Sequence, residues 1–288
     1  MRWPCDQRPA TVTNDRLGRG ALAPLTPDEA ARLPGVVRGF MWPAEFLMFS
    51  DFLVAQAHAH SAIQVVIGMD GPCRVEIDGA WREIPGVVIG TDVSHCLDAA
   101  GSLVAIGWVE AESHLGERIG RRPRSSRGWA AVDEQTAAGI AELWRPALDR
   151  STPCSRGYRA WRQGLALLAG EEAPPPPVDP RIDAVLAYLR RAPSPSPTIT
   201  QLTAVATLSE SRLQHLFREQ VGVPIRRYLL WQRILTAMSL LAEGASITDA
   251  AHGAGFADGP HLTRTTHRMN GVSPGDMRPV DVWLSNCR

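Results

Sequence analysis

The sequence predicts an α+β protein in which an N-terminal β-barrel with following helices precedes a C-terminal all-α domain with two helix-turn-helix motifs. Short apolar runs separated by Gly-rich turns fill residues 46–109, and helical patterns fill residues 181–288. Four consecutive prolines between these regions favour a stiff, extended spacer. We therefore expect a first domain over residues 1–170, a linker over 171–180 and a helical domain over 181–288.

Five segments of the N-terminal region have the composition of β-strands, because they are apolar, β-branched or alternating. They are Leu47 to Gln56, Ile63 to Ile67, Cys73 to Ile77, Val87 to Ile89 and Leu103 to Trp108. Turn-forming pairs such as Asp78-Gly79 and Pro85-Gly86 separate them. Many short strands at close spacing are typical of a small barrel or jelly roll. The first forty residues, rich in Arg, Pro and Gly, predict an arm or an irregular cover.

Residues 129–169 change to a helical period and predict one or two helices packed after the barrel. Their apolar positions are Ala137, Ile140, Ala141, Leu143, Trp144, Leu148, Trp161, Leu165, Leu167 and Leu168. Two roles stay open for these helices. They form an interface between two copies of the chain, or they cover the barrel alone.

The region after the linker predicts two helix-turn-helix motifs joined by one long helix. The first motif runs from Thr200 to Phe217 and the second from Ser246 to Arg264. Ser209 is a suitable N-cap for the second helix of the first motif. An amphipathic helix from Ile225 to about Glu243 fixes the separation of the two motifs. Since such a motif can lay a helix in the major groove, the pair predicts a protein that reads DNA.

Charge and composition are compatible with a DNA-binding protein but do not distinguish it from other helical proteins. The net charge of zero divides into +4 for residues 181–288 and −4 for the remainder. A modest basic excess suits phosphate contacts, although ordinary solvated helices explain it equally well. No apolar run approaches the ~20 residues that span a bilayer, and the chain starts without a signal-peptide core. We therefore expect a cytoplasmic protein with no membrane partner. Five scattered cysteines exclude a disulfide framework and a zinc finger.

Two sets of residues with intact spacing extend across the helix-turn-helix pair. The first set is Leu213, Phe217, Gly222, Pro224, Tyr228, Arg233, Ala237, Leu240 and Leu241. The second set is Ile247, Ala251, Gly255, Phe256, Asp258, Arg264, Gly271, Ser273, Pro274 and Arg278. On these residues the chain resembles the AraC/XylS family of transcription regulators over about a third of its length. The resemblance implies a seven-helix DNA-binding unit in a regulator, an activator rather than a repressor, that works with RNA polymerase.

The resemblance also implies which side chains meet the bases of double-stranded DNA. From the first recognition helix these are Ser211, Arg212, Gln214 and His215, and from the second they are Pro260, His261 and Arg264. Proline has no backbone N–H to donate, so base reading by the second helix rests on His261 and Arg264.

The second motif departs from the family pattern at positions that normally fill its core. Leu262 and Thr266 stand where the family has Phe, and Ala250 stands where it has Ile. Each lost aromatic ring removes a large buried area, so we expect a thinner and less stable core in this half. The alternative to a DNA reader is a pair of structural helical hairpins.

Four polar residues of the barrel follow the order of the ligands in cupin barrels, which this region resembles: His58, His60, Gln64 and His95. Because side chains alternate along a strand, His58 and His60 would share a face, with His95 coming from a facing strand. Gln64 replaces the carboxylate that metal-binding cupins use.

Three interpretations of this cluster stay open. His58, His60 and His95 bind a divalent metal such as zinc, or all four residues line a pocket for a small organic effector, or the cluster is a remnant in a filled barrel.

Taken together, these observations predict a cupin-like sensing barrel attached to an AraC-type DNA-binding domain. Its expected partners are double-stranded DNA, a small-molecule effector, RNA polymerase and a second copy of the chain. The alternative is a metal-dependent cupin sensor or enzyme, since an open coordination position supports dioxygenase or isomerase chemistry. The missing carboxylate and the attached DNA reader argue against an enzyme, and no serine or cysteine triad is evident.

Overall fold

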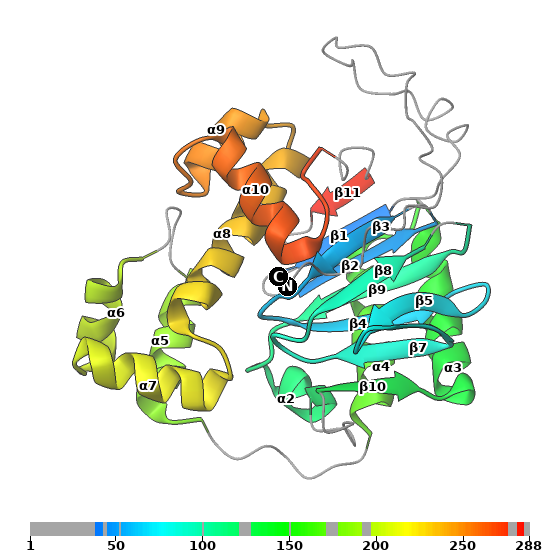
Figure 1. The fold of residues 1–288 in the computed structure, drawn as a ribbon, viewed down its shortest axis with the longest axis horizontal. Coiled ribbons are helices and arrows are strands. Elements are labelled where there is room, and N and C mark those ends of the chain that lie inside the picture. The colour runs from blue at the N-terminus through cyan, green and yellow to red at the C-terminus, as the bar shows by residue number, and fades with distance from the viewer. Residues whose placement is uncertain are drawn as a thin grey trace.

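The computed structural model consists of two β-sheets with helices on two sides of them (Figure 1). It describes residues 38–275 and 281–284, apart from residues 43–44, 52, 100, 121–127, 150, 171–177 and 192–196. The predicted N-terminal arm up to residue 37 and the four prolines of the predicted linker therefore lie outside the described residues.

Seven strands form the larger sheet, in the order β10-β7-β4-β9-β2-β1-β11. Their bounds are β1 (Arg38–Trp42), β2 (Glu45–Ser50), β4 (Ile63–Gly68), β7 (Gly86–Ile89), β9 (Val104–Val109), β10 (Trp129–Val132) and β11 (Asp281–Leu284). Neighbouring strands are antiparallel except β1 and β11, which pair in parallel. The smaller sheet has the order β3-β8-β5-β6, with β3 (Val54–His58), β8 (His95–Asp98), β5 (Cys73–Ile77) and β6 (Ala80–Ile84).

Side chains of the larger sheet alternate between two apolar cores, as the two-residue period of a strand requires. On β2, Leu47 and Phe49 pack with the helices on the outer face of the sheet. Phe46 and Met48 point the other way, into a core that the smaller sheet shares. The alternation explains why both faces of these strands are apolar.

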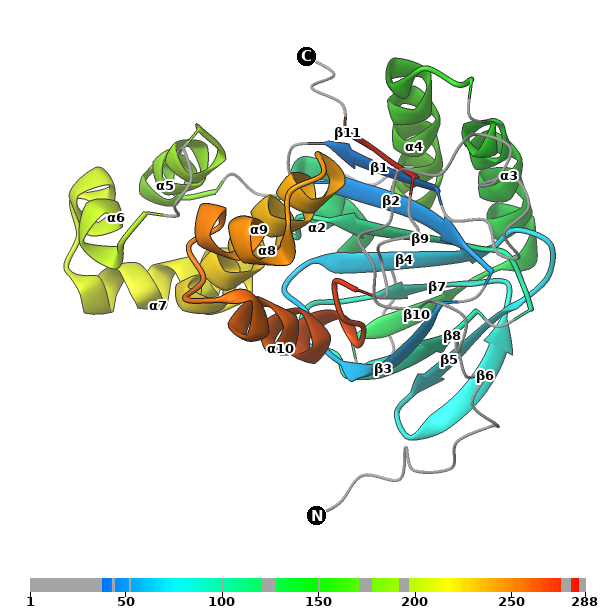
Figure 2. The same ribbon diagram turned by 90° about the horizontal axis from the view of Figure 1, so that it is seen from above.

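The helices that follow the barrel cover the outer face of the larger sheet (Figure 2). They are α2 (His114–Gly120), α3 (Glu134–Trp144), a short 3₁₀ helix (Arg145–Leu148) and α4 (Cys154–Ala169). Trp144 of α3 and Trp161 of α4 are fully buried, with ring centroids 4.9 Å apart. The two predicted helices are therefore present, and their apolar faces cover the barrel.

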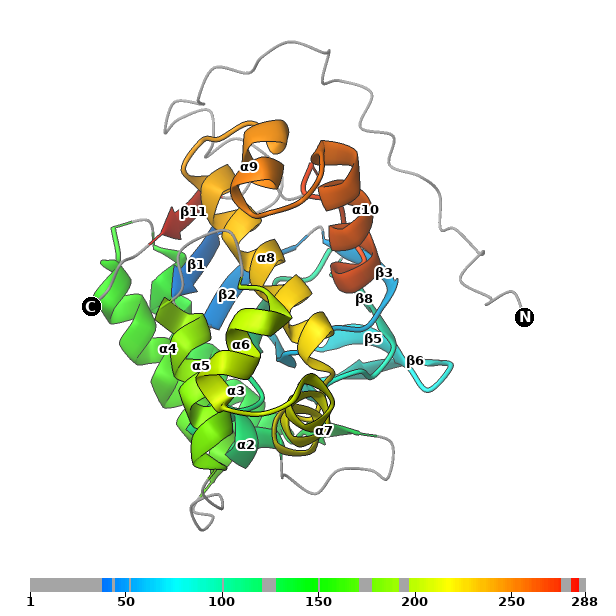
Figure 3. The same cartoon turned by 90° about the vertical axis from the view of Figure 1, so that its left-hand side faces the viewer.

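The C-terminal helices lie at one end of the two sheets, with α8 running between α7 and the pair α9 and α10 (Figure 3). Their bounds are α5 (Pro180–Arg191), α6 (Ile199–Ala206), α7 (Glu210–Val221), α8 (Ile225–Ala242), α9 (Ile247–Gly253) and α10 (Gly259–Asn270). Helices α6 and α7 form the first helix-turn-helix motif, and α9 and α10 form the second. The described part of this region holds six helices where the resemblance implies seven, and its last described segment is the strand β11.

The two motifs are packed in different ways. Helices α5 to α7 and the start of α8 enclose a core of their own, centred on Leu213 and Phe217. The rest of α8 and the second motif instead join the core of the barrel, where Phe256 and Leu262 lie in one apolar cluster with Trp108 of β9. The small residues of the second motif thus border barrel side chains, which complete the core that we expected to be thin.

The barrel also differs from the predicted strand pattern. The segment from Leu47 to Gln56 is not one strand, because β2 ends at Ser50 and β3 starts at Val54 in the other sheet. Five strands were not predicted: β1, β6, β8, β10 and β11. Short strands such as β6, whose residues are exposed or half-buried, carry too little apolar alternation to be recognised from sequence.

Candidate functional site

Helix α7 presents an exposed face opposite its core. Its start is set by Ser209, whose Oγ accepts a hydrogen bond from the backbone N–H of Arg212 at 3.3 Å. This confirms the predicted N-cap. Of the predicted DNA-contacting residues, Ser211, Arg212 and His215 are exposed and Gln214 is half-buried. The structure therefore brings all four to the outer side of one helix.

Helix α10 has the same construction. Asp258 Oδ1 accepts a hydrogen bond from the backbone N–H of His261 at 2.6 Å. Pro260 lies in the first turn, where a missing N–H breaks no helical hydrogen bond. Pro260, His261 and Arg264 are all exposed, and the His261 ring rests edge-on against Phe256 at 5.3 Å. This helix too offers its predicted residues to solvent.

A polar network orients part of the α7 surface. Gln214 Nε2 donates to Glu210 Oε1 at 2.7 Å, and Arg226 of α8 pairs with the same carboxylate at 3.4 Å. Glu210 lies in the first turn of α7, where a negative charge is favourable to the helix dipole. Its charge would repel a phosphate, but Arg226 offsets it. The amide oxygen of Gln214 remains able to accept a bond from a base edge.

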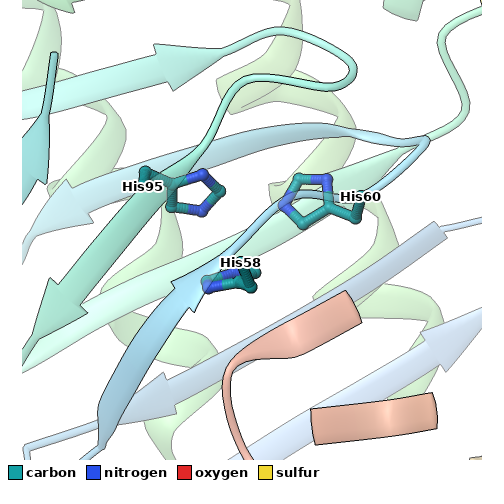
Figure 4. Close-up of side chains that lie close together, drawn as sticks. All are labelled: His58, His60 and His95. Carbon is teal, nitrogen blue, oxygen red and sulfur yellow. The ribbon is translucent and has the colours of Figure 1, made fainter. Parts of the chain in front are cut away.

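The three histidines of the barrel converge, although not by the route that we predicted (Figure 4). Strand β3 ends at His58, and His60 follows in the next loop, so strand alternation does not place them together. His95 opens β8 and is the register partner of His58 in the same sheet, not on a facing strand. Ring centroids lie 4.2 Å apart for His58 and His95, 5.3 Å for His60 and His95, and 5.6 Å for His58 and His60.

Each ring is held in one tautomer by a backbone carbonyl. Nδ1 of His58 lies 2.7 Å from the Gln56 carbonyl oxygen, and Nδ1 of His60 and His95 lie 2.9 Å from those of Ala62 and Val93. Because a carbonyl oxygen only accepts hydrogen bonds, every Nδ1 carries the proton. Every Nε2 therefore presents a lone pair.

Burial keeps these imidazoles neutral. It lowers the pKa of His58 to about 4 and the pKa of His60 to about 3, and it holds the pKa of His95 well below its usual range. The three Nε2 atoms are buried and have no hydrogen-bond partner among the described residues. One ligand atom from each ring lies within 4.8 Å of the others. The cluster can bind a metal ion or accept hydrogen bonds from a ligand.

Gln64 adjoins this cluster, because its side chain interacts with the ring of His60. It sits on β4 of the larger sheet, is buried, and lines a small cavity together with His58. The cavity has a volume of about 30 Å³. Its other walls are apolar residues of the barrel and of α8, together with the polar side chain of Asn270 at the end of α10.

The residues of the helical domain that contact the barrel site were not predicted from the sequence. Trp231 of α8 lies over His60 at 5.8 Å between ring centroids. Gly271, just after α10, accepts a hydrogen bond from the Gln56 backbone N–H at 3.0 Å through its carbonyl oxygen. No local signal marks this role, since Trp231 has the pattern of any apolar helical position and Gly271 that of a helix cap.

A polar group of contacts fixes the start of α8 to the barrel. Glu110 Oε1, at the end of β9, accepts hydrogen bonds from Tyr228 Oη at 3.1 Å and Gln232 Nε2 at 2.8 Å. Arg227 pairs with Asp92 and donates to the Ala59 carbonyl oxygen at 2.8 Å. Burial and the nearby carboxylates raise the pKa of Tyr228 well above its usual range, so its hydroxyl keeps the proton that it donates.

Comparisons with known proteins agree with the paired motifs. Residues 202–279 match a family model described as a helix-turn-helix domain. An AraC-like transcription regulator of Streptomyces antibioticus is 34% identical over 175 residues, which are 60% of this chain and 52% of the relative. A second one, of Streptomyces lividans, is 35% identical over 195 residues, or 67% and 56%. The chain thus spans about half the length of these two relatives.

A solved structure shows that the whole architecture occurs elsewhere. Apo ToxT from Vibrio cholerae has a TM-score of 0.52 and 10% identity, and the match covers 82% of this chain and 97% of ToxT. At that identity the likeness concerns the fold alone. No helix in the described part of this chain is long and apolar enough to cross a membrane.

The helix-turn-helix match and the two Streptomyces relatives agree with the residue pattern that runs through both motifs. The chain belongs to the AraC/XylS family of transcription regulators.

Proposed function

We propose that this protein regulates transcription by binding double-stranded DNA through α7 and α10 and that a small ligand inside the barrel controls it. The observation that carries this proposal is the pair of capped helices with exposed polar faces, joined by the single helix α8. An uninterrupted helix keeps two recognition helices at a constant spacing, as reading of successive major grooves requires.

The proposed base contacts are the residues expected from the family resemblance: Ser211, Arg212, Gln214 and His215 on α7, and Pro260, His261 and Arg264 on α10. Arginine contributes most to such contacts, because its planar fork can donate two hydrogen bonds to guanine. The exposed Arg264 is therefore the residue on which specificity of the second motif depends most.

The proposed ligand site is the interior of the barrel around His58, His60, Gln64 and His95. Its support is that α8 and the end of α10 line the cavity beside these residues, so that a ligand there meets the DNA-binding helices directly. A ligand that binds the closed and open arrangements with different affinity shifts the balance between them. The cavity of about 30 Å³ has no room for an organic molecule, so a ligand of that size would require the open arrangement.

The remaining features of the proposed regulator follow the family. We place the sensing domain in residues 1–170, the linker in 171–180 and the DNA-binding domain in 181–288. The protein is proposed to act in the cytoplasm as an activator that works with RNA polymerase, and α3 and α4 to join two copies of the chain. The exposed Leu167 on α4 supports the last point, because the structure leaves it uncovered.

The test begins with selection of duplexes from a random-sequence DNA pool by the full-length protein. Arg264→Ala should weaken binding to the selected duplex by ~1–3 kcal/mol and reduce its preference over a scrambled duplex. Arg159→Ala, which removes an exposed arginine from α4, is the matched control and should leave binding unchanged. If no duplex is enriched, or if both variants bind equally well, the proposed function is wrong.

A further inference from the structure

We propose that His58, His60 and His95 bind one divalent transition-metal ion and that the second helix-turn-helix motif responds to this ion through Gly271. The metal site stands on the geometry of the barrel alone. Only the response of the motif rests on the proposed function.

The donor set suits a metal of the zinc class. One ring nitrogen from each histidine lies within 4.8 Å of the others, and the three buried Nε2 atoms have no hydrogen-bond partner among the described residues. Neutral imidazoles are favoured ligands of Zn²⁺, Ni²⁺ and Fe²⁺. Each ring donates its other N–H to a backbone carbonyl, which is the arrangement that orients metal-ligating histidines. Three protein ligands leave a fourth position for water or another small ligand.

The dimensions of the cavity favour an ion over an organic effector. Sites for small organic molecules usually enclose ~300–1,000 Å³. The cavity beside the cluster, which His58 and Gln64 line but His60 and His95 do not, holds about 30 Å³ and suffices for a water molecule next to a bound ion. Buried lone pairs without a donor are costly in an apolar surrounding, and a bound cation satisfies all three at once.

The end of the recognition helix α10 touches one of the three histidines. Gly271 caps α10 with a φ of 71°, and its carbonyl oxygen accepts the N–H of Gln56. A Cβ atom on Gly271 would lie 2.8 Å from both Gln56 N and His58 Nδ1, so the backbone is packed directly against this ring. Only glycine fits between the helix end and strand β3.

Metal binding requires the rings to move. The ligand atoms are spread over distances of up to 4.8 Å. A tetrahedral site with Zn–N bonds of ~2.0–2.1 Å has nitrogens roughly 3.4 Å apart. The rings therefore draw together, and the shift of His58 acts on the backbone that holds the end of α10. If that shift changes DNA affinity, bound DNA must change metal affinity by the same factor.

The first experiment titrates metal-free full-length protein with Co²⁺ and follows its visible absorption, with the metal content checked after dialysis against Zn²⁺. We expect one ion per chain with the strong bands of four-coordinate cobalt. His95→Gln removes a ligand that lies away from α10 and should weaken binding more than about 100-fold, since even outer-shell changes cost ~10–100-fold. The control is His252→Gln, on the exposed side of α9. Absence of a stoichiometric ion, or equal binding by both variants, overturns the site.

The second experiment measures affinity for the selected duplex with and without Zn²⁺. We expect a change of at least ~5-fold in the natural chain, and an equal change in Co²⁺ affinity when the duplex is present. Gly271→Asn should reduce the zinc effect below about twofold even at zinc concentrations that saturate its own site, as its Co²⁺ titration defines them. Asparagine tolerates the left-handed backbone, but its Cβ collides with β3.

A matched variant separates this collision from any effect of capping. Gly222 caps α7 in the same left-handed conformation, with a φ of 85°, and the nearest atom to an added Cβ is 3.8 Å away. Gly222→Asn should therefore keep the full zinc effect. The proposed response is overturned if both variants lose the zinc effect on DNA affinity to the same extent, or if zinc does not change the DNA affinity of the natural chain.

Three further results complete the test. If Gly271→Asn fails to fold, as circular dichroism would show, the reciprocal change of Co²⁺ affinity in the natural chain still decides whether metal and DNA are linked. If no duplex is selected with or without zinc, the proposed function fails and the response fails with it. The cobalt titration then decides the metal site by itself.

Discussion

The junction between the barrel and the helical domain depends on Trp231, and its removal should loosen that junction. The side chain is only 4% exposed and lines the cavity beside His58. A tryptophan buries ~150–250 Å², which at ~25 cal/mol per Å² corresponds to about 4–6 kcal/mol. Measured costs of Trp→Ala changes in cores are ~3–5 kcal/mol. We therefore expect Trp231→Ala to weaken the junction by about 3–5 kcal/mol.

The assay is hydrogen exchange of the Gln56 amide, which donates across the junction to the Gly271 carbonyl oxygen. Because each 1.4 kcal/mol changes the equilibrium for opening of the junction tenfold, hydrogen exchange of this amide should accelerate by ~100-fold or more in Trp231→Ala. Trp144→Ala is the matched control, since this tryptophan is fully buried on the other side of the larger sheet. Trp144→Ala should lower the free energy of unfolding, measured by urea titration, to a similar extent. It should accelerate hydrogen exchange of the Gln56 amide only through global unfolding.

Equal effects of the two tryptophan variants would contradict the proposed role of Trp231. If Trp231→Ala and Trp144→Ala accelerate exchange of the Gln56 amide equally at equal global stability, Trp231 does not hold the two parts together. The shared apolar core of barrel and second motif would then contribute little to their association.

Two further predictions concern the packing of α4 and the chemistry of a buried thiol. Gly164→Ala should lower the free energy of unfolding by ~1–3 kcal/mol, because its Cβ would lie 2.6 Å from Trp144 Cε2. Gly139→Ala on the neighbouring α3 should instead raise the free energy of unfolding by up to ~1 kcal/mol, since its Cβ meets only a side-chain atom at 3.8 Å. Thermal unfolding would show whether each variant is stabilised or destabilised, and a change in the same direction for both would contradict the packing of α4. Burial raises the pKa of Cys73 to about 12 from a usual 9.0, so its thiolate fraction at pH 8 is ~1,000-fold below that of an exposed thiol. Iodoacetamide at pH 8 should therefore spare Cys73 in the native protein and label it in urea, as peptide mass spectrometry would show; rapid native labelling would contradict the buried site.

The features that the sequence predicts correctly are those that depend on near neighbours in the chain. Ser209 caps α7, as predicted, by accepting a hydrogen bond from the backbone N–H of the third residue after it. Helical periods mark α3, α4 and α5 to α10 within a few residues, and exposed faces of α7 and α10 follow from the same periods. The apolar run from Leu103 to Trp108 marks β9, whereas the run from Leu47 to Gln56 covers β2 but was predicted to continue through β3 as one strand.

The convergence of the histidines was predicted for the wrong reason. Alternation along a strand was expected to bring His58 and His60 together, but β3 ends at His58. The loop that follows and the pairing of β3 with β8 bring the rings to one centre. Strand pairing across this separation depends on the register between two strands that are distant in the sequence, which a local pattern does not encode.

The two recognition helices, the long helix between them and the family can be predicted from the sequence, because caps and periods are short-range properties of the chain. The core that the second motif shares with the barrel and the contact of Gly271 with His58 arise only in the folded protein. These contacts join residues more than two hundred positions apart, as Gln56 and Gly271 show. They depend on how two folded surfaces match in shape, and that match exists only once both surfaces have formed.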